Sequence, residues 1–138
     1  MPTINLAEAE QIIAGSKAKI FEMGVKMSVS VTDSRGDLIA MIKTDGASWR
    51  TPTISRGKAI ASATFGAPSV DLEERSRSPV FSAFTVMQEG NFIMSQGALP
   101  VFKEGEIAGA VGASGGNSKE DEDVARAGIV AAGLSMTA

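Results

Sequence analysis

The sequence predicts an α+β fold in which a mostly antiparallel sheet carries helices packed on it. Segments with helical spacing are separated by groups of short apolar segments joined by tight turns, so consecutive strands form hairpins. No alternating strand–helix–strand units, which would build a parallel sheet, are seen along the chain. The expected order is α-β-β-α-(short turns)-β-β-β-α, which places five strands in a single domain spanning residues 1–138.

The first three elements follow from capping and periodicity. Asn5 and Glu8 have the spacing of a capping box, and Gly24 is a natural end for a helix over residues 6–23. Residues 25–32 then alternate apolar and polar, which is typical of a strand with one buried face. A turn at residues 33–37 leads into a second strand at 38–42, completing a hairpin.

The middle of the chain begins with a second helix and then becomes irregular. Thr51 is expected to cap this helix, with Pro52 in its first position and an end near Phe65. Residues 70–84 are polar and interrupted by Pro79, which predicts short helical turns with loop between them.

The last part of the chain predicts three strands and a helix. The strands are expected at residues 91–95, 99–103 and 107–113, the last two joined by a tight turn. Ser118 is expected to cap a final helix that runs to about Leu134. The many Ala and Gly residues of this helix permit close packing, either on the sheet or against another subunit.

Three residue types are missing from the 138 residues: His, Cys and Tyr. Their absence excludes a zinc site of the usual kind, a Ser-His-Asp or Cys-His nucleophile, a disulfide and a histidine-ligated haem. The remaining chemistry must use carboxylates, Lys, Arg, hydroxyls, Met, backbone amides or a bound cofactor.

The charge distribution and the lengths of the apolar segments exclude two classes of partner. The net charge is −3, and neither half of the chain has a basic stripe with interleaved aromatic residues, so we expect no nucleic-acid partner. No apolar segment approaches the roughly 20 residues of a transmembrane helix, and the N-terminal residues lack the pattern of a secretory signal. We therefore expect a cytoplasmic protein without a membrane partner.

Several cations are concentrated in one otherwise nearly neutral region. They include Arg50, Arg56 and Lys58. If Lys58 faces inward, its ammonium needs an anion, either a carboxylate of the protein in a buried ion pair or a carboxylate of a ligand. Lys58 is therefore the first candidate for a binding residue. The acidic run at residues 120–123 is interpreted as stabilising the start of a helix, and no metal site is predicted.

Trp49 and Phe84, with Phe81 and Met87, flank the irregular middle segment. They are candidates for the apolar wall of a ligand site, because Met and aromatic side chains line many small-molecule pockets. The alternative, which we favour slightly, is a subunit interface, because this segment has little regular structure of its own to bury them.

A set of short motifs resembles the GlcG/HbpS-like proteins, which are related to the C-terminal domain of corrinoid adenosyltransferases of the PduO type. The matching stretches lie at residues 31–38, 45–47, 57–59, 65–69, 97–101, 105–115, 118–122 and 125–128. The resemblance implies an α+β fold with a five-stranded antiparallel sheet, commonly in an oligomer, and an association with haem or corrinoid binding. The corrinoid-associated members use a histidine that this sequence lacks, so an organic-acid ligand is preferred over haem.

Two functional hypotheses follow. In the first, the protein binds a carboxylated ligand, a small organic acid or a tetrapyrrole, through Lys58 and Arg50 or Arg56 beside an apolar wall. In the second, it is a cofactor-independent enzyme acting on a small organic acid. Lys58 would then stabilise developing negative charge, and a desolvated carboxyl group such as Glu89 or Asp121 would transfer the proton. A homo-oligomer is expected in both cases.

Overall fold

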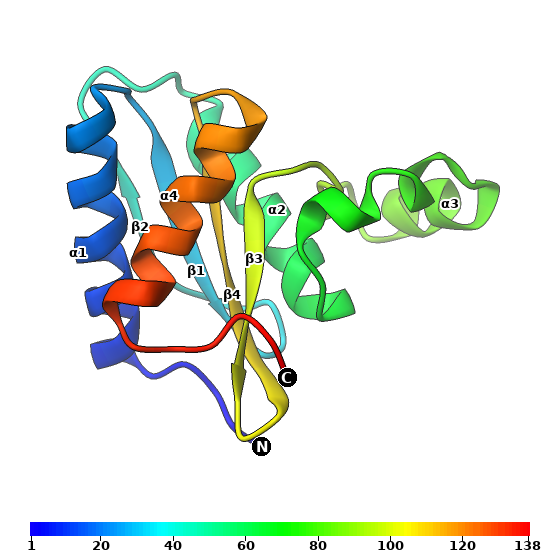
Figure 1. Ribbon diagram of the computed structural model, residues 1–138. Coiled ribbons are helices and arrows are strands. Elements are labelled where there is room, and N and C mark those ends of the chain that lie inside the picture. Colours follow the sequence, from blue (N-terminus) through cyan, green and yellow to red (C-terminus); the bar gives the residue numbers. More distant parts are fainter.

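An antiparallel sheet lies between two layers of helices in the computed structural model, which describes all 138 residues, Met1–Ala138 (Figure 1). Its four strands are paired in the order β2-β1-β4-β3 and comprise β1 (Ser28–Asp33), β2 (Leu38–Lys43), β3 (Ala98–Lys103) and β4 (Glu106–Ser114). The helices that cover it are α1 (Leu6–Met23) and α4 (Ser118–Ala131) on one face and α2 (Thr51–Phe65) on the other. The predicted α+β class is confirmed. No helix combines the length and apolar character needed to cross a membrane.

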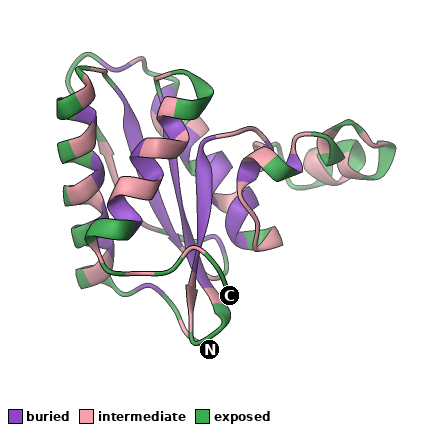
Figure 2. Ribbon diagram, viewed as in Figure 1, coloured by how far each residue is buried: buried purple, intermediate pink, exposed green.

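The two faces of the sheet differ in side-chain size. The α1 and α4 side holds the main core, in which branched residues such as Val29, Val31 and Val111 pack against Ile12 and Ile129. The α2 side carries small residues instead, mostly Ser, Ala and Gly. Small side chains let α2 lie close to the strands, and Figure 2 shows the central strands buried between the two layers.

Residues 25–32 do not form the half-buried strand that their alternation predicts. β1 starts at Ser28, and five of its six residues are buried. The serines that alternate with the valines face α2, where Ser30 Oγ lies 2.7 Å from Ser55 Oγ. The prediction was wrong because a hydroxyl that finds a partner on a covering helix can be buried as completely as an apolar side chain.

The fifth strand, predicted at residues 91–95, is absent. This segment lies along α2, and the amide of Ile93 donates to the carbonyl oxygen of Gly57 at 3.1 Å. A Cβ on Gly57 would collide with the Ile93 side chain, so this contact requires glycine. The apolar run Phe92–Met94 therefore packs against α2 and its neighbours, and its amide pairs with a helix carbonyl rather than with another strand.

The helix starts agree with the sequence in one case and differ by one residue in two. α1 has the expected capping box of Asn5 and Glu8 and the expected left-handed Gly24. α4 is capped by Asn117, through a second capping box, rather than by Ser118. Thr51 is the first residue of α2 rather than its cap, and its hydroxyl donates to the carbonyl oxygen of Ser48 at 2.8 Å.

The segment after α2 contains two 3₁₀ helices and one further α-helix. They are η1 (Ser69–Leu72), η2 (Arg75–Arg77) and α3 (Pro79–Met87). The expected short turns are present, but Pro79 begins a helix rather than interrupting one, because proline is tolerated in the first helical turn. Ser78 caps this helix by accepting from the amide of Phe81 at 3.2 Å.

The small residues of α4 serve an intramolecular contact with α1. A Cβ on Gly128 would collide with the hydroxyl of Ser16 and with the backbone oxygen of Ile12. Ser16 also donates to the carbonyl oxygen of Val124 at 2.8 Å, which ties the two helices together. Of the two alternatives for these residues, close packing and subunit contact, Gly128 takes part in packing within the chain.

A buried hydroxyl without a partner leads to a first testable prediction. Thr32 is fully buried, and its Oγ1 has no hydrogen-bond partner. Thr32→Val is expected to raise the free energy of unfolding by about 1 kcal/mol, because it removes an unsatisfied polar group while keeping the branched shape. Urea unfolding followed by circular dichroism would measure this change.

Thr44→Val is the matched control. The Thr44 hydroxyl accepts from the amide of Met27 and donates to the carbonyl oxygen of Met27, both at 2.8 Å. This substitution should lower the free energy of unfolding by about 1–3 kcal/mol. Equal effects of the two substitutions would contradict the expectation for Thr32.

Candidate functional site

A cleft of about 420 Å³ opens where α2 begins, β4 ends and the loop at residues 44–50 crosses the end of the sheet. Two of its lining residues are cations, Lys26 and Arg50, and neither makes an ion pair within the chain. The Lys26 side chain lies over Gly46, which takes a positive φ of 83° in this loop. No acidic residue lines the cleft, so its electrostatic character is that of a site for an anion.

A group of hydroxyls forms the inner wall of the cleft. Ser114 lies opposite Ser28 in the register of β1 and β4, so both side chains face α2. The Ser28 hydroxyl lies 2.8 Å from Thr51 Oγ1. Ser114 is only 6% exposed and lines the cleft, yet its hydroxyl has no hydrogen-bond partner within the chain. A hydroxyl in that position is free to bond to water or to a ligand in the cleft.

The buried ion pair of Lys58 and Asp121 contacts the chain next to Ser114, on the side of the wall away from the cleft. Lys58 Nζ lies 2.9 Å from Asp121 Oδ2 and donates to the carbonyl oxygen of Ala113 at 3.1 Å. The other carboxylate oxygen of Asp121 accepts from the amide of Gly116 at 2.9 Å. Lys58 and Asp121 are both about 95% buried, and together they hold the Ser114–Gly116 segment against α2 and α4.

Burial has a measurable effect on Asp121. Removal from water raises the pKa of its carboxyl group above the ordinary value, although the hydrogen bond and charge of Lys58 and the amide of Gly116 act in the opposite direction. The negative charge of Glu120 contributes to the increase. An ionised Asp121 therefore depends on Lys58 for compensation.

Lys58 faces inward, which was the condition for its role as a binding residue, but its anion is a carboxylate of the protein. The ligand-binding hypothesis required an ammonium with no protein carboxylate within salt-bridge distance, and Asp121 stands at that distance. Lys58 thus matches the alternative of a buried ion pair. Lys58 donates to the carbonyl oxygen of Ala113, next to Ser114. Its partner Asp121 accepts from the amide of Gly116, which lines the cleft.

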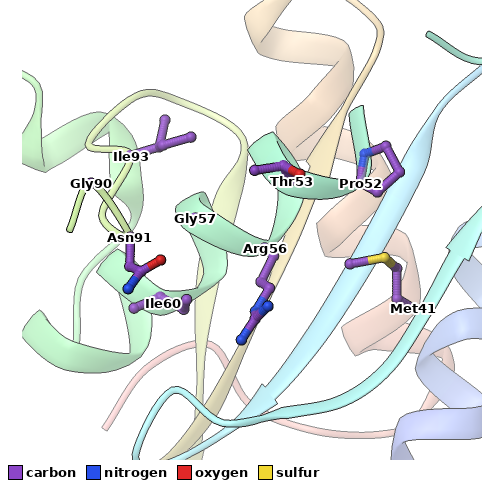
Figure 3. A pocket seen from close by; sticks show the side chains of 9 residues that line it. All are labelled: Met41, Pro52, Thr53, Arg56, Gly57, Ile60, Gly90, Asn91 and Ile93. Atoms are coloured by element: carbon purple, nitrogen blue, oxygen red, sulfur yellow. The ribbon is translucent and has the colours of Figure 1, made fainter. Parts of the chain in front are cut away.

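The other predicted site residues do not meet in one place. Arg56 lines a separate, smaller pocket of about 130 Å³ between α2, β2 and residues 90–93, together with Met41, Ile60 and Ile93 (Figure 3). Trp49 is 81% exposed, next to Arg50 in the loop. Phe84, on α3, belongs to an aromatic cluster with Phe65 of α2, Phe81 and Phe92.

Three residues that line the cleft, Lys26, Ser48 and Ser114, are not predicted from the sequence. The alternation of residues 25–32 places Lys26 on the polar face of a strand, and serines alone carry no functional signal. The family-like stretches at residues 45–47 and 105–115 were the available signal, since Gly46, Ala47, Ser114 and Gly115 all line the cleft.

Comparison with known proteins gives consistent matches over almost the whole chain. The family model described as "Haem degrading protein HbpS-like" matches residues 4–130. An uncharacterized 15.0 kDa protein of the dhaT-dhaS intergenic region of Citrobacter freundii is 28% identical over 129 residues, covering 92% of this chain and 90% of that protein.

Solved structures share the fold. Protein ORFY of Klebsiella pneumoniae has a TM-score of 0.89 at 25% identity, covering 96% of this chain and 92% of that one. A PduOC–haem complex has a TM-score of 0.88 at 17% identity and covers 99% of both chains. At such identity, the second likeness concerns the fold alone.

Proposed function

The protein belongs to the HbpS-like family, whose model spans residues 4–130, and from this premise we propose that it binds a small carboxylated molecule in the cleft between Lys26 and Arg50. One observation carries the proposal: two cations without ion-pair partners and a serine hydroxyl that makes no hydrogen bond within the chain line a cleft that has no acidic residue. Arginine can bind a carboxylate through two parallel hydrogen bonds, and lysine supplies a point charge. The volume of about 420 Å³ lies in the range of small-molecule sites.

The ligand is a small organic acid or a tetrapyrrole, both of which carry carboxylates. One structural relative, PduOC, was solved as a complex with haem, which supports the tetrapyrrole. The absence of His favours the organic acid, because any haem iron would need Met, Lys or a hydroxyl as its ligand. A homo-oligomer in the cytoplasm completes the proposal.

The predicted residues take different roles in this proposal. Arg50 contacts the carboxylate, and Lys58 positions the Ser114–Gly116 wall through Asp121. Arg56, Trp49 and Phe84 do not line the cleft, and ligand contact by these residues remains a prediction. Replacing each of them in the binding assay below tests these three contacts separately.

The enzyme hypothesis is second. Asp121 is buried and its pKa is raised, as a proton-transferring carboxyl group would require. However, both of its oxygens are hydrogen-bonded inside the protein, and the residue does not line the cleft. Glu89 is exposed just beyond α3. Neither of these two candidate carboxyl groups lines the cleft.

Binding of carboxylates should depend on Arg50. In calorimetric titrations with acetate, glycolate, malonate and succinate, at least one acid is expected to bind saturably to the intact protein. Arg50→Met should weaken that binding by about 10-fold or more, which corresponds to the loss of a charge-assisted hydrogen bond. Haemin is titrated in parallel, with the Soret band as the readout, to distinguish a tetrapyrrole from a small acid.

Arg35→Met is the matched control, because Arg35 lies in the β1–β2 turn, outside the cleft. It should leave the affinity unchanged. If the intact protein bound neither the four acids nor haemin, or if Arg50→Met bound as tightly as the intact protein, the proposal would be wrong.

A further inference from the structure

A groove of about 410 Å³ lies next to the cleft, on the side of α1. It is lined by side chains from residues 17–26, at the C-terminal end of α1, and from residues 42–45, where β2 passes into the loop at residues 44–50. Figure 1 shows the end of α1 and this loop side by side at one end of the sheet. Thr44 and Asp45 of the loop line the groove, and the next three residues line the cleft, so the two are neighbours.

Lys26 is the residue that the groove and the cleft share. Its aliphatic chain lies along the backbone of Gly46, where an added Cβ would stand 2.9 Å from Lys26 Cδ and 3.0 Å from Lys26 Nζ. This contact holds the ammonium at the border between the groove and the cleft. A molecule that occupies both must therefore pass over a positive charge.

The groove is basic in a protein that is acidic overall. Its charged lining residues are three lysines, Lys17, Lys26 and Lys43, and one aspartate, Asp45. All three lysines are exposed, and none of the ion pairs of the chain includes one of them. Like charges gathered in one groove repel one another, and an anion bound among them removes that repulsion. The net charge of the protein is −3, so composition alone does not explain this local excess of cations.

The groove also has an apolar wall. Phe21, Val25 and Ile42 line it, and Phe21 is 67% exposed. Phe21 follows Lys17 by one turn on the same face of α1, and Val25 and Ile42 each directly precede a lysine of the groove. Apolar surface therefore accompanies each cation. Such a surface suits the methylene groups of a ligand, which gain free energy when they leave water.

We propose that the ligand is a linear dicarboxylate that occupies the cleft and the groove together. One carboxylate binds Arg50 in the cleft. The methylene chain crosses Lys26 and packs on the apolar wall of the groove, and the second carboxylate lies between Lys17 and Lys43. This inference rests on the proposed carboxylate site and specifies its ligand class. A short acid fills the cleft alone and leaves the two outer lysines without an anion.

A series of diacids of increasing length tests the span. In calorimetric titrations at constant ionic strength with malonate, glutarate, pimelate and azelate, at least one longer diacid should bind the intact protein about 10-fold more tightly than malonate, because its second carboxylate reaches the groove. The monomethyl ester of that diacid keeps the length and one charge, and it should lose most of this gain. An affinity that stays constant along the series, or an ester that binds as tightly as the diacid, would overturn the inference.

The lysines of the groove are tested by removing one charge at a time. Lys17→Met and Lys43→Met should each weaken binding of the preferred diacid at least several-fold and leave that of malonate unchanged. Lys19→Met is the matched control, because it removes the same charge from α1, but Lys19 lies about 200° around the helix from Lys17 and does not line the groove. Equal effects of Lys43→Met and Lys19→Met would contradict the proposed contact.

The short acid separates this inference from the carboxylate site on which it rests. If malonate binds through Arg50 and no longer diacid binds more tightly, the cleft is a carboxylate site and the groove is not part of it. Binding of haemin without binding of any diacid would support the carboxylate site and overturn the linear ligand. If neither the diacids nor haemin bind, both proposals are wrong.

Discussion

Asp121→Ala should lower the free energy of unfolding by about 3–5 kcal/mol, because it leaves the ammonium of Lys58 buried without a counter-charge. Lys58 is 5% exposed, and its remaining contact would be the carbonyl oxygen of Ala113. The amide of Gly116 would also lose its acceptor. Chemical denaturation at pH 7 measures this loss.

The double variant Lys58→Met with Asp121→Leu provides the control. Replacing both charges with apolar side chains of similar size removes the attraction and the cost of desolvation together, so the double variant should be within about 1–2 kcal/mol of the intact protein. A single variant as stable as the double variant would show that the pair is not buried in solution. Since the pair holds the Ser114–Gly116 wall, Asp121→Ala should also weaken carboxylate binding.

Gly112→Ala should be the second severe substitution, at about 3 kcal/mol or more. Gly112 lies on β4 under α2, and a Cβ there would collide with the backbone oxygen of Ser55 and stand 2.8 Å from the backbone nitrogen of Ala59. These are main-chain atoms of a helix, so α2 as a whole must shift, which carries the cost of overpacking and separates Ser30 from Ser55. Thermal unfolding, with circular dichroism as the readout, gives the change.

Gly133→Ala is the control for this substitution. Gly133 has a φ of 70° and nothing within 4 Å of an added Cβ, so it reports only the left-handed backbone penalty of about 1–2 kcal/mol. A similar loss at both positions would contradict close packing as the cause at Gly112.

Capping and periodicity predicted α1 and the two C-terminal strands well, because these depend on neighbours in the sequence. Asn5, Glu8 and Gly24 act within one or two turns, and the Glu104–Gly105 turn joins β3 to β4 directly. The same local rules mispredicted residues 91–95. An apolar run is compatible with a strand or with packing on a helix, and only the position of Gly57 selects the second.

The candidate site was predicted only in part for the same reason. The sequence offered Arg50 as a candidate, and Lys58 on the condition that it faces inward, but the partner of Lys58 lies 63 residues further along the chain. Lys26 and Ser114 enter the cleft because β1 and β4 are neighbours, and β1 begins and β4 ends beside the start of α2. Periodicity in one segment contains no information about such a meeting point.

The sequence by itself determined the α+β class, the family, most helix ends and the exclusion of histidine and cysteine chemistry, because these depend on residue identity and local spacing. The tertiary structure decided that Lys58 has a protein carboxylate as its partner, that the cations of the cleft have none, and that the apolar α3 lies outside the core. The free energy of a charge or an apolar surface depends on what surrounds it in space, and those surroundings come from segments far apart in the chain.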